Sequence, residues 1–376
     1  MKSDKTTPNV PTLRFPNCNG EWQKTVMGKV CSFRKGYGIA KDDLSSDGTP
    51  CILYGELYTT YKTAIAKTIK SKTSIQSKSL VYSQKDDVII PCSGETAEDI
   101  ATSICVPYDG VLLGGDLTIV HSDLDGAFLS NQINSVRKYD IARIAQGKSI
   151  VHLQADELKK IFIFYPSIQE QHKISAFIDK IDERIEIQNK IISKYETLIK
   201  GLCDMIFRHN KSVSLSDLVK CKTSALQENM VSTCHRGKYK VLGASGAISA
   251  IDTYQFEESG ILVLKDGSKA GKIQFAEGKY SVIGTSIVLI PNEACDARYL
   301  YFAMSSIDFE KYKVGSGIPH IYFKDYSNER IYYPEKSLRK RITEALDAYD
   351  IKLGIEKEML SALQKQKAFL IKSIFI

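Results

Sequence analysis

Apolar residues recur at alternating spacings of four and three positions in two long stretches of the chain. In the first stretch these seam positions hold Ile174, Ile178, Ile181, Ile185, Gln188, Ile192, Tyr195, Ile199, Leu202 and Ile206. In the second stretch they hold Ile342, Leu346, Tyr349, Leu353, Glu356, Leu360, Leu363, Lys367, Leu370 and Ile374. A period of about 3.5 residues kept over this length predicts a coiled coil, although each helix could instead pack only on its own globule. Gln188 and Glu356 occupy the same heptad position, where a polar side chain can set the register.

The second half of the chain repeats the first. When the sequence is shifted by 168 positions, residues 147–207 align with residues 315–375 without a gap, and 14 of the 61 pairs are identical. Upstream, residues 88–94 resemble 261–267 at a shift of 173, and residues 114–120 align with 284–290 at a shift of 170. An internal repeat of this length predicts two copies of one structural unit.

Each copy is predicted to be a globule followed by a long helix, with limits at residues 1–164, 165–207, 208–332 and 333–376. Short apolar runs separated by Gly, Asp and Ser predict strands in both globules, and residues 98–104 and 296–305 predict short helices. The predicted fold class is therefore α+β, with two similar globules alternating with two long helices. Because the chain crosses a globule between them, the helices are expected to pair as an antiparallel coiled coil, a rod of roughly 50 Å.

Composition narrows the class of protein further. Lys and Arg number 51 against 44 Asp and Glu, so the net charge of +7 mildly favours an anionic partner. No apolar run approaches the length of a membrane span, and the first residues lack the apolar core of a signal peptide. The nine cysteines form neither a C-x2-C nor a C-x4-C pair. We therefore expect a cytoplasmic protein without a membrane span, a disulfide framework or a metal site.

Positive charge is concentrated in one stretch. Residues 62–85 contain six lysines and no acid, interleaved with Ser, Thr, Gln and Tyr, which suits contact with nucleic acid better than a solvated loop. Residues 235–240 and the glycine-containing loop 265–272 are the smaller counterparts in the second globule, although that loop could also be an ordinary turn. The candidate DNA contacts are Lys62, Lys67, Lys70, Lys72, Lys78, Ser93, Glu95, Thr96, Arg236, Lys238, Lys240, Ser268, Lys269 and Lys272.

The repeat places different chemistry at equivalent positions of these loops. Glu95 of the first copy aligns with Ser268 of the second. A carboxylate accepts a hydrogen bond from a cytosine amino group, which the ammonium of Lys269 beside Ser268 cannot do. Such a difference is expected of two globules that recognise different sequences.

Motifs for catalysis are missing. Gly147-Lys148-Ser149 resembles the end of a phosphate-binding loop, but Ala142 stands where its first glycine is required. His152 and His320 recur in the repeat without a nucleophile motif beside them, so we interpret both as structural. The chain also lacks a zinc-protease motif and the Asn-Pro-Pro-aromatic motif of amino methyltransferases. We therefore predict no catalytic residue in this chain.

Several of these segments resemble the specificity (S, or HsdS) subunits of type I restriction–modification systems. The resemblance rests on residues 10–16, 20–22, 27–30, 48–58 and 93–100, and on the Tyr165-Pro166 and Tyr333-Pro334 junctions that lead into the helices. It implies that each globule is a target recognition domain reading one half of a split double-stranded DNA sequence, and that the helices are the spacer. It also implies two modification subunits as partners. In complexes that cut DNA, restriction subunits join them.

The resemblance further implies that this chain binds no cofactor itself, since S-adenosylmethionine, ATP and Mg2+ belong to the partner subunits. Three alternatives remain open on the sequence: a coiled-coil scaffold without DNA specificity, an enzyme such as a nuclease with an unrecognised site, and a subunit of a complex that only methylates. Salt-dependent binding to duplex DNA distinguishes the specificity subunit from the scaffold. Mg2+-dependent cleavage by the isolated chain would indicate the nuclease.

Overall fold

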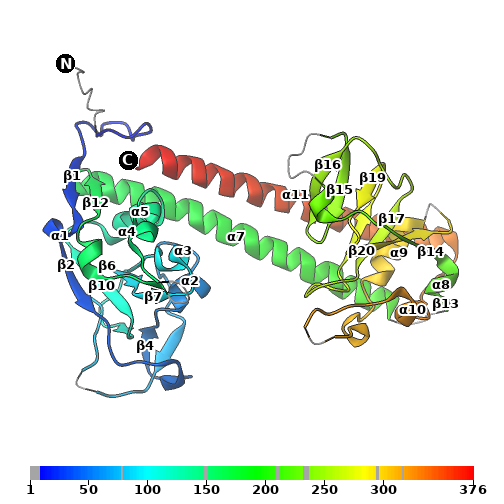
Figure 1. Ribbon diagram of the computed structural model, residues 1–376, viewed down its shortest axis with the longest axis horizontal. Helices are drawn as coiled ribbons and strands as arrows, with labels where there is room; N and C mark the ends of the chain where they lie inside the picture. The colour runs from blue at the N-terminus through cyan, green and yellow to red at the C-terminus, as the bar shows by residue number, and fades with distance from the viewer. Residues whose placement is uncertain are drawn as a thin grey trace. The chain divides into compact units, whose positions relative to one another are not determined.

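The computed structural model of the chain is shown in Figure 1. It describes residues 9–77, 79–147, 151–208, 212–231, 237–293, 296–315 and 317–376. The chain divides into two compact units, and we consider each by itself. Unit 1 comprises Met1–Gln188 and Leu360–Ile376, and unit 2 comprises Asn189–Met359.

The main sheet of unit 1 has four antiparallel strands in the order β2 (Cys31–Lys35), β10 (Leu117–Ser122), β6 (Asp87–Pro91) and β8 (Ile104–Val106). All five residues of β6 are buried, because side chains pack against both faces of this central strand. Helices α4 (Gly126–Asn134) and α5 (Lys138–Ile144) contribute to the core on one face, where Leu129 and Ile133 join Val88 and Val120. Helix α4 begins at Asp125, whose carboxylate accepts from the Phe128 N–H at 2.7 Å.

A second, smaller sheet of unit 1 has the order β3 (Leu44–Ser45), β5 (Ser71–Thr73), β4 (Thr49–Ile52) and β9 (Leu112–Leu113). Short elements complete the unit: β1 (Gln23–Val26), α1 (Met27–Val30), η1 (Lys41–Asp43), α2 (Glu56–Thr59), β7 (Ser93–Gly94), α3 (Ala97–Ile100), β11 (Val151–His152), α6 (Ala155–Leu158) and β12 (Phe162–Tyr165). Two lysines of the lysine-rich stretch belong to this region, because Lys72 lies on β5 and Lys70 immediately precedes it.

Unit 2 has the same plan. Its main sheet has the order β14 (Val219–Thr223), β20 (Ser286–Pro291), β17 (Gly260–Leu264) and β18 (Ile273–Ala276), with α9 (Ala297–Met304) packed against it. Its smaller sheet has the order β16 (Gly246–Ile251), β15 (Tyr239–Gly243) and β19 (Tyr280–Val282). The remaining elements are β13 (Val213–Ser214), α8 (Leu215–Leu218), η2 (Glu228–Met230), η4 (Glu310–Tyr312), α10 (Phe323–Tyr326) and β21 (Arg330–Ile331). The two globules therefore contain both helix and sheet, as an α+β class requires.

The strand registers correct one detail of the sequence repeat. Leu117 pairs with Pro91 in unit 1, and Ser286 pairs with Leu264 in unit 2. Given the shift of 173 between β6 and β17, this register relates β10 to β20 by 169 positions, so the predicted shift of 170 was wrong by one. The error has a physical cause: every residue of β20 is buried, so its apolar pattern does not distinguish one register from the next.

Two long helices follow the globules along the chain, α7 (Ile168–Phe207) and α11 (Lys336–Ile374). Within unit 1, Ile174 and Ile178 of α7 share one buried cluster with Ile374 of α11, and Lys367 forms an ion pair with Asp182. Within unit 2, residues from the end of α7 share a core with residues from the start of α11, namely Ile199, Leu202, Cys203, Phe207, Ile342 and Leu346.

The predicted seam positions are buried or half-buried with one exception. Tyr349 is 38% exposed, so less of its side chain is buried than at the other predicted seam positions. Asp347 and Asp350, which flank Tyr349 in the sequence, both accept from the guanidinium group of Arg298. The globule therefore holds this part of α11 through its carboxylates, and the tyrosine stays at the surface.

Among the described residues, we find no helix with both the length and the apolar character needed to cross a membrane.

Candidate nucleic-acid interface

A short antiparallel bridge recurs in both globules, and its histidine contacts the candidate loop. Gln146 and His152 exchange two backbone hydrogen bonds of 2.9 and 2.7 Å, and Val314 and His320 exchange two of 2.9 and 2.8 Å. In unit 1 the His152 Nδ1 atom lies 3.2 Å from the Ser93 hydroxyl. In unit 2 the His320 Nδ1 atom lies 2.7 Å from the carboxylate of Asp266. Each recurring histidine thus holds the loop that follows the central strand of the main sheet.

These contacts change the role of two predicted site residues in unit 1. Ser93 is only 8% exposed and is turned toward His152, so it positions the loop rather than reaching a ligand. Thr96 caps α3, because its hydroxyl accepts from the Asp99 N–H at 3.1 Å and donates to the Asp99 carboxylate at 2.6 Å. Glu95 lies between them and is exposed, so its carboxylate is available at the surface.

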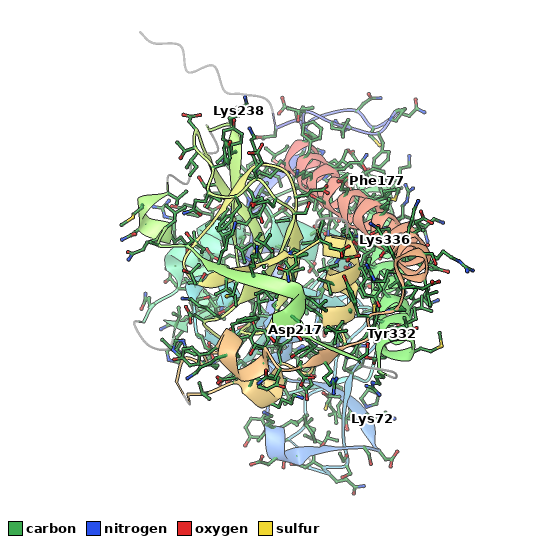
Figure 2. All side chains as sticks on the ribbon, turned by 90° about the vertical axis from the view of Figure 1, so that its right-hand side faces the viewer. Lys72, Phe177, Asp217, Lys238, Tyr332 and Lys336 are labelled. Carbon is green, nitrogen blue, oxygen red and sulfur yellow. The ribbon has the colours of Figure 1, made fainter. Side chains whose placement is uncertain are left out.

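The lysines of the lysine-rich stretch differ in whether they have a carboxylate partner. Lys62, Lys70 and Lys72 are exposed, and Lys72 lies on β5, as Figure 2 shows. The Lys62 ammonium donates to the Thr59 carbonyl at 3.3 Å. Lys78 lies outside the described residues.

Lys67 is engaged by the long helix. Its Nζ atom lies 2.6 Å from Asp179 and 2.9 Å from Glu183, both on α7. Partial burial lowers the pKa of Lys67, but hydrogen bonds to these two carboxylates outweigh it and raise the pKa overall. Hydrogen bonds from Lys180 and Lys67 lower the pKa of Glu183 to about 2. Since two carboxylates already neutralise Lys67, we assign it to anchoring the globule on α7 rather than to a DNA phosphate.

The smaller sheet of unit 2 also presents lysines. Lys240 is exposed on β15, and the Lys238 ammonium lies 5.5 Å from the ring centre of Tyr239. Arg236 lies outside the described residues. Lys72 of β5 and Lys240 of β15 thus give both smaller sheets an exposed cation.

The loop from β17 to β18 exposes Ser268, Lys269 and Lys272. Its two glycines have positive φ values, +93° at Gly267 and +89° at Gly271. A Cβ atom at Gly271 would lie 2.5 Å from the Cβ of Phe309, so only glycine allows this close packing. The loop is therefore held tightly against the globule while its polar side chains face outward.

Sequence reasoning missed the contacts that join each globule to its helix. In unit 2, Arg339 of α11 pairs with the carboxylate of Asp296 at 2.9 and 3.0 Å and donates to the Pro334 carbonyl at 2.7 Å. At the equivalent place in unit 1, Gln171 accepts from the Asp125 N–H at 3.0 Å and donates to a proline carbonyl at 2.9 Å. The two contacts use different chemistry, so an identity count does not reveal them.

The repeat contains a signal for other contacts between globule and helix. Asp179 and Asp182 of the first helix are identical to Asp347 and Asp350 of the second. In unit 2 both aspartates bind Arg298, at 2.5 and 2.8 Å. Recurring acids on a helix flank could therefore have been read as partners for cations of the globule.

The opening motif of the chain acts in the same way within unit 1. The Arg14 guanidinium forms two hydrogen bonds with the buried carboxylate of Glu170, at 2.8 and 2.7 Å, in the first turn of α7. The N–H of Leu13 donates to the Ser373 carbonyl at 2.9 Å near the end of α11. Residues 10–16 thus hold the start of α7 and the end of α11.

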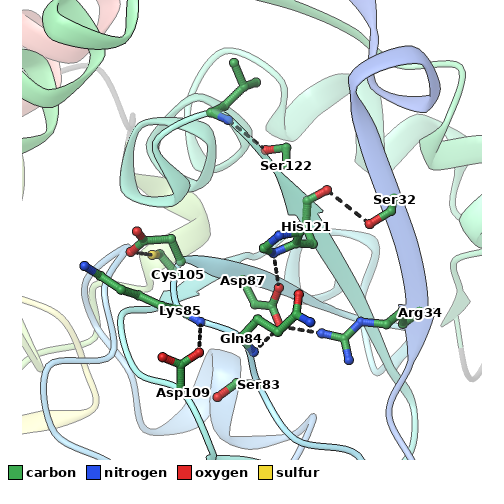
Figure 3. A network of polar contacts seen from close by, with 12 residues as sticks. Ser32, Arg34, Ser83, Gln84, Lys85, Asp87, Cys105, Asp109, His121 and Ser122 are labelled. Atoms are coloured by element: carbon green, nitrogen blue, oxygen red, sulfur yellow. Dashed lines mark hydrogen bonds and ion pairs between the residues drawn. The ribbon is translucent and has the colours of Figure 1, made fainter.

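An ionic network surrounds the buried carboxylate of Asp87 on the main sheet of unit 1 (Figure 3). Asp87 is fully buried and accepts from Arg34 at 2.7 Å, and the His121 Nδ1 atom lies 2.8 Å from its other oxygen. The equivalent positions of unit 2 hold Lys222, Gly260 and Ile290. The two globules have therefore diverged on this face of the main sheet. Within the described ranges, no group of three or more His, Cys, Asp or Glu residues could hold a metal ion.

These features define a duplicated α+β module in which each copy presents a small lysine-bearing sheet and is fastened to a heptad helix. Residues 19–197 and 208–365 match the family described as type I restriction modification DNA specificity domain. The two matches cover most of the 376 residues, so this chain belongs to that family. Family membership favours DNA recognition over the scaffold alternative.

Individual relatives agree with this assignment. Over 122 residues the chain is 30% identical to the type I restriction enzyme MjaVIII specificity subunit of Methanocaldococcus jannaschii, which is 31% of this chain and 28% of that protein. The S subunit of a type I restriction–modification system from M. genitalium has a similar structure, with a TM-score of 0.66 and 18% identity over 98% of this chain and 99% of that one. A chain from a structure described as showing complex assembly and conformational transition of the type I R-M system is also similar. Its TM-score is 0.52 and its sequence identity is 16%, over 96% of this chain and 99% of that one. At these identities the structural likeness concerns the fold alone.

Proposed function

We propose that this chain is the DNA-specificity subunit of a type I restriction–modification complex and binds a bipartite double-stranded target. The observation that carries the proposal is the duplicated recognition module, in which equivalent loops present different side chains. Glu95 is exposed in the first loop, and Ser268 is exposed at the equivalent position of the second. Two loops of unlike chemistry on one repeated framework suit the reading of two unlike half-sites.

Affinity comes from lysines that neutralise DNA phosphates. In the first target recognition domain these are Lys62, Lys70 and Lys72, and in the second Lys238, Lys240, Lys269 and Lys272. The logarithm of the affinity then falls linearly with the logarithm of the salt concentration. Specificity comes from contacts to base edges in the major groove. There the Glu95 carboxylate is suited to accept a hydrogen bond from a cytosine amino group.

The two helices act as the spacer, paired along their length as an antiparallel coiled coil. The local contacts that support this pairing are the ion pairs Asp182–Lys367 and Glu196–Lys357 and the burial of the seam. The 40 residues of α7 extend about 60 Å at 1.5 Å per residue. A rod of this length relates the two half-sites in distance and in helical phase, since one turn of DNA advances about 34 Å.

The partners are two modification subunits, which dock at equivalent places on the two helices. Ile187 and Ile355 are related by the repeat and are 56% and 54% exposed. Isolated exposed apolar residues are ordinary, but recurrence in both copies favours two docking sites of one kind. Restriction subunits join in complexes that cut DNA. The chain itself supplies recognition and no catalysis, and S-adenosylmethionine, ATP and Mg2+ are used by the partner subunits.

Mapping of methylated adenines in a genome that carries this chain and its modification subunit tests the proposal. We expect a split motif with a spacer of constant length. Replacing residues 22–164 with those of a relative should change one half of the motif and leave the other half intact. Methylation without a split motif, or a change in both halves after the exchange, would contradict the proposal.

A further inference from the structure

A hollow of about 720 Å³ in unit 2 joins the end of α7 to the loop between β17 and β18. Its lining includes Lys200, Asp204 and Arg208 of the α7 segment and residues 268–273 of the loop. Residues 304–310 and Lys313 complete the lining. The hollow therefore combines a predicted DNA-contact loop with side chains of the spacer helix, which the sequence did not connect with it.

The charges around this hollow are not balanced. Asp204 pairs with Arg208 at 3.4 Å, and Glu310 pairs with Lys313 at 2.7 Å. A third acid, Asp308, accepts from the Glu310 N–H at 3.1 Å. The three other cations of the lining have no carboxylate partner in the described part of the chain, and all three are exposed: Lys200, Lys269 and Lys272.

The loop also offers backbone donors. The N–H groups of Ala270, Gly271 and Lys272 donate within the loop or to β17. Those of Ser268 and Lys269 have no acceptor among the residues that the structure describes. Adjacent free N–H groups in a turn, flanked by lysines, bind the oxygens of phosphate groups well. The contact of Gly271 with Phe309 keeps this turn in place without a ligand.

We propose that this hollow binds a phosphodiester of the DNA backbone beside the second half-site, so that the end of the spacer helix contacts DNA directly. The inference rests on the proposed function and extends it from the recognition loops to α7. Lys200, Lys269 and Lys272 supply charge, and the turn at Ser268 and Lys269 supplies two N–H donors. These contacts position the second domain on the duplex without reading its sequence.

Unit 1 also contains a hollow beside the end of a long helix. It measures about 220 Å³ and is lined by the last turns of α11, by the end of α4 and by residues 61–64. Ser135 ends α4 and Ser305 ends α9, and each lines the hollow of its own unit. The charged residues of the unit 1 lining are Lys62, Lys138 and Lys367, with no acid. Lys367 is paired with Asp182, so Lys62 and Lys138 are the lysines of this lining without a carboxylate partner in the described part of the chain. Both units thus have a lysine-lined hollow beside the end of a long helix, although the recognition loop contributes to it in unit 2 only.

The test is duplex binding by the complex of this chain with its modification subunit, across a series of salt concentrations. Each lost phosphate contact makes the slope of log affinity against log salt shallower by about 0.9. At 150 mM salt this corresponds to a roughly fivefold loss of affinity. The double variant K200A/K269A should therefore bind the mapped target about 25-fold more weakly, with a slope shallower by about 1.8. Its methylated sequence should be unchanged, because phosphate contacts carry no sequence information.

Two variants serve as controls. Lys340 lies on α11 outside the hollow and is 78% exposed, so K340A should bind like the wild type. D204N removes an acid from the lining and releases Arg208, so it should bind more tightly than the wild type. Unchanged affinity and slope in K200A/K269A, or an equal loss in K340A, would overturn the inference while leaving the proposed function intact.

The phosphate could also come from a free nucleotide. If K200A/K269A lost binding of ATP or inorganic phosphate but kept the wild-type duplex affinity, the hollow would serve free phosphate and the inference would be wrong. Wild-type complex that binds no duplex in a salt-dependent manner would instead refute the proposed function itself.

Discussion

Removing one heptad from each long helix should shorten the preferred DNA spacer. The deletion takes out residues 188–194 of α7 and 356–362 of α11, which are equivalent under the 168-residue shift and lie near the middle of their helices. A whole heptad preserves the seam, because Tyr195 and Leu363 move into the positions vacated by Gln188 and Glu356. The exposed Ile187 and Ile355 are retained, so docking of the modification subunits is not disturbed.

The magnitude follows from helix geometry. Seven residues at 1.5 Å each shorten the rod by about 10 Å. One base pair advances 3.4 Å, so the distance alone corresponds to about three base pairs. Each base pair removed also rotates one half-site about the DNA axis by about 35° relative to the other. This rotation favours the loss of fewer base pairs. We therefore expect the spacer to shorten by about two or three base pairs while both half-sites stay the same.

Genome-wide mapping of methylated adenines in cells that express the deletion variant measures the spacer directly. The variant K357A is the matched control, because the deletion also removes Lys357 and its half-exposed ion pair with Glu196. Such pairs contribute little to stability, so K357A should keep the natural spacer. An unchanged spacer in a folded, active deletion variant would refute the spacer role of the helices, and altered half-sites would show that α7 or α11 takes part in reading bases.

Three further predictions concern stability and assembly. R339A leaves the buried Asp296 carboxylate without its guanidinium partner and should lower the free energy of unfolding by about 3–5 kcal/mol in urea titrations, whereas a loss below about 1 kcal/mol would contradict the buried pair. Because the pKa of Glu183 is lowered to about 2, its ion pairs contribute stability above its ordinary pKa of 4.5 that is lost as the pH falls toward 2. E183Q should therefore reduce the fall in Tm between pH 5 and pH 3, and an identical pH profile would argue against the pairing. I187D or I355D should each remove one modification subunit in native mass spectrometry, and the double variant should remove both, while F369D should keep two because Gly201 is its repeat counterpart. Loss of both subunits from a single variant would contradict two independent docking sites.

The parts of the fold that depend on local periodicity could be predicted from the sequence. The predicted seam positions of α7 and α11 other than Tyr349 are buried or half-buried, because a helix buries the stripe that its own sequence makes apolar. Tyr349 departs from this rule, since Arg298 holds the neighbouring aspartates at the surface. Registers between strands were less predictable. An all-apolar strand such as β20 satisfies burial in more than one register, and only pairing with β17 selects the shift of 169.

The candidate site was predictable in composition but not in the role of each residue. Lys72 and Lys269 are exposed, as a phosphate contact requires. Lys67 came from the same lysine-rich stretch, yet two carboxylates more than 110 positions away in the sequence neutralise it. Ser93 looked like a polar loop residue, and it is buried against His152. Such assignments depend on which distant segments meet, and composition does not record that.

The amino-acid sequence by itself determined the duplication, the two heptad helices and the lysine-rich stretch, because each is a pattern of residue types along the chain. Tertiary structure alone decided which lysines stay without a carboxylate partner and which, like Lys67, are paired. It also brought Lys200 of α7 beside Lys269 of the loop in one hollow. The physical reason is that the electrostatic and packing environment of a side chain is set by neighbours in space, and most of those neighbours are remote in sequence.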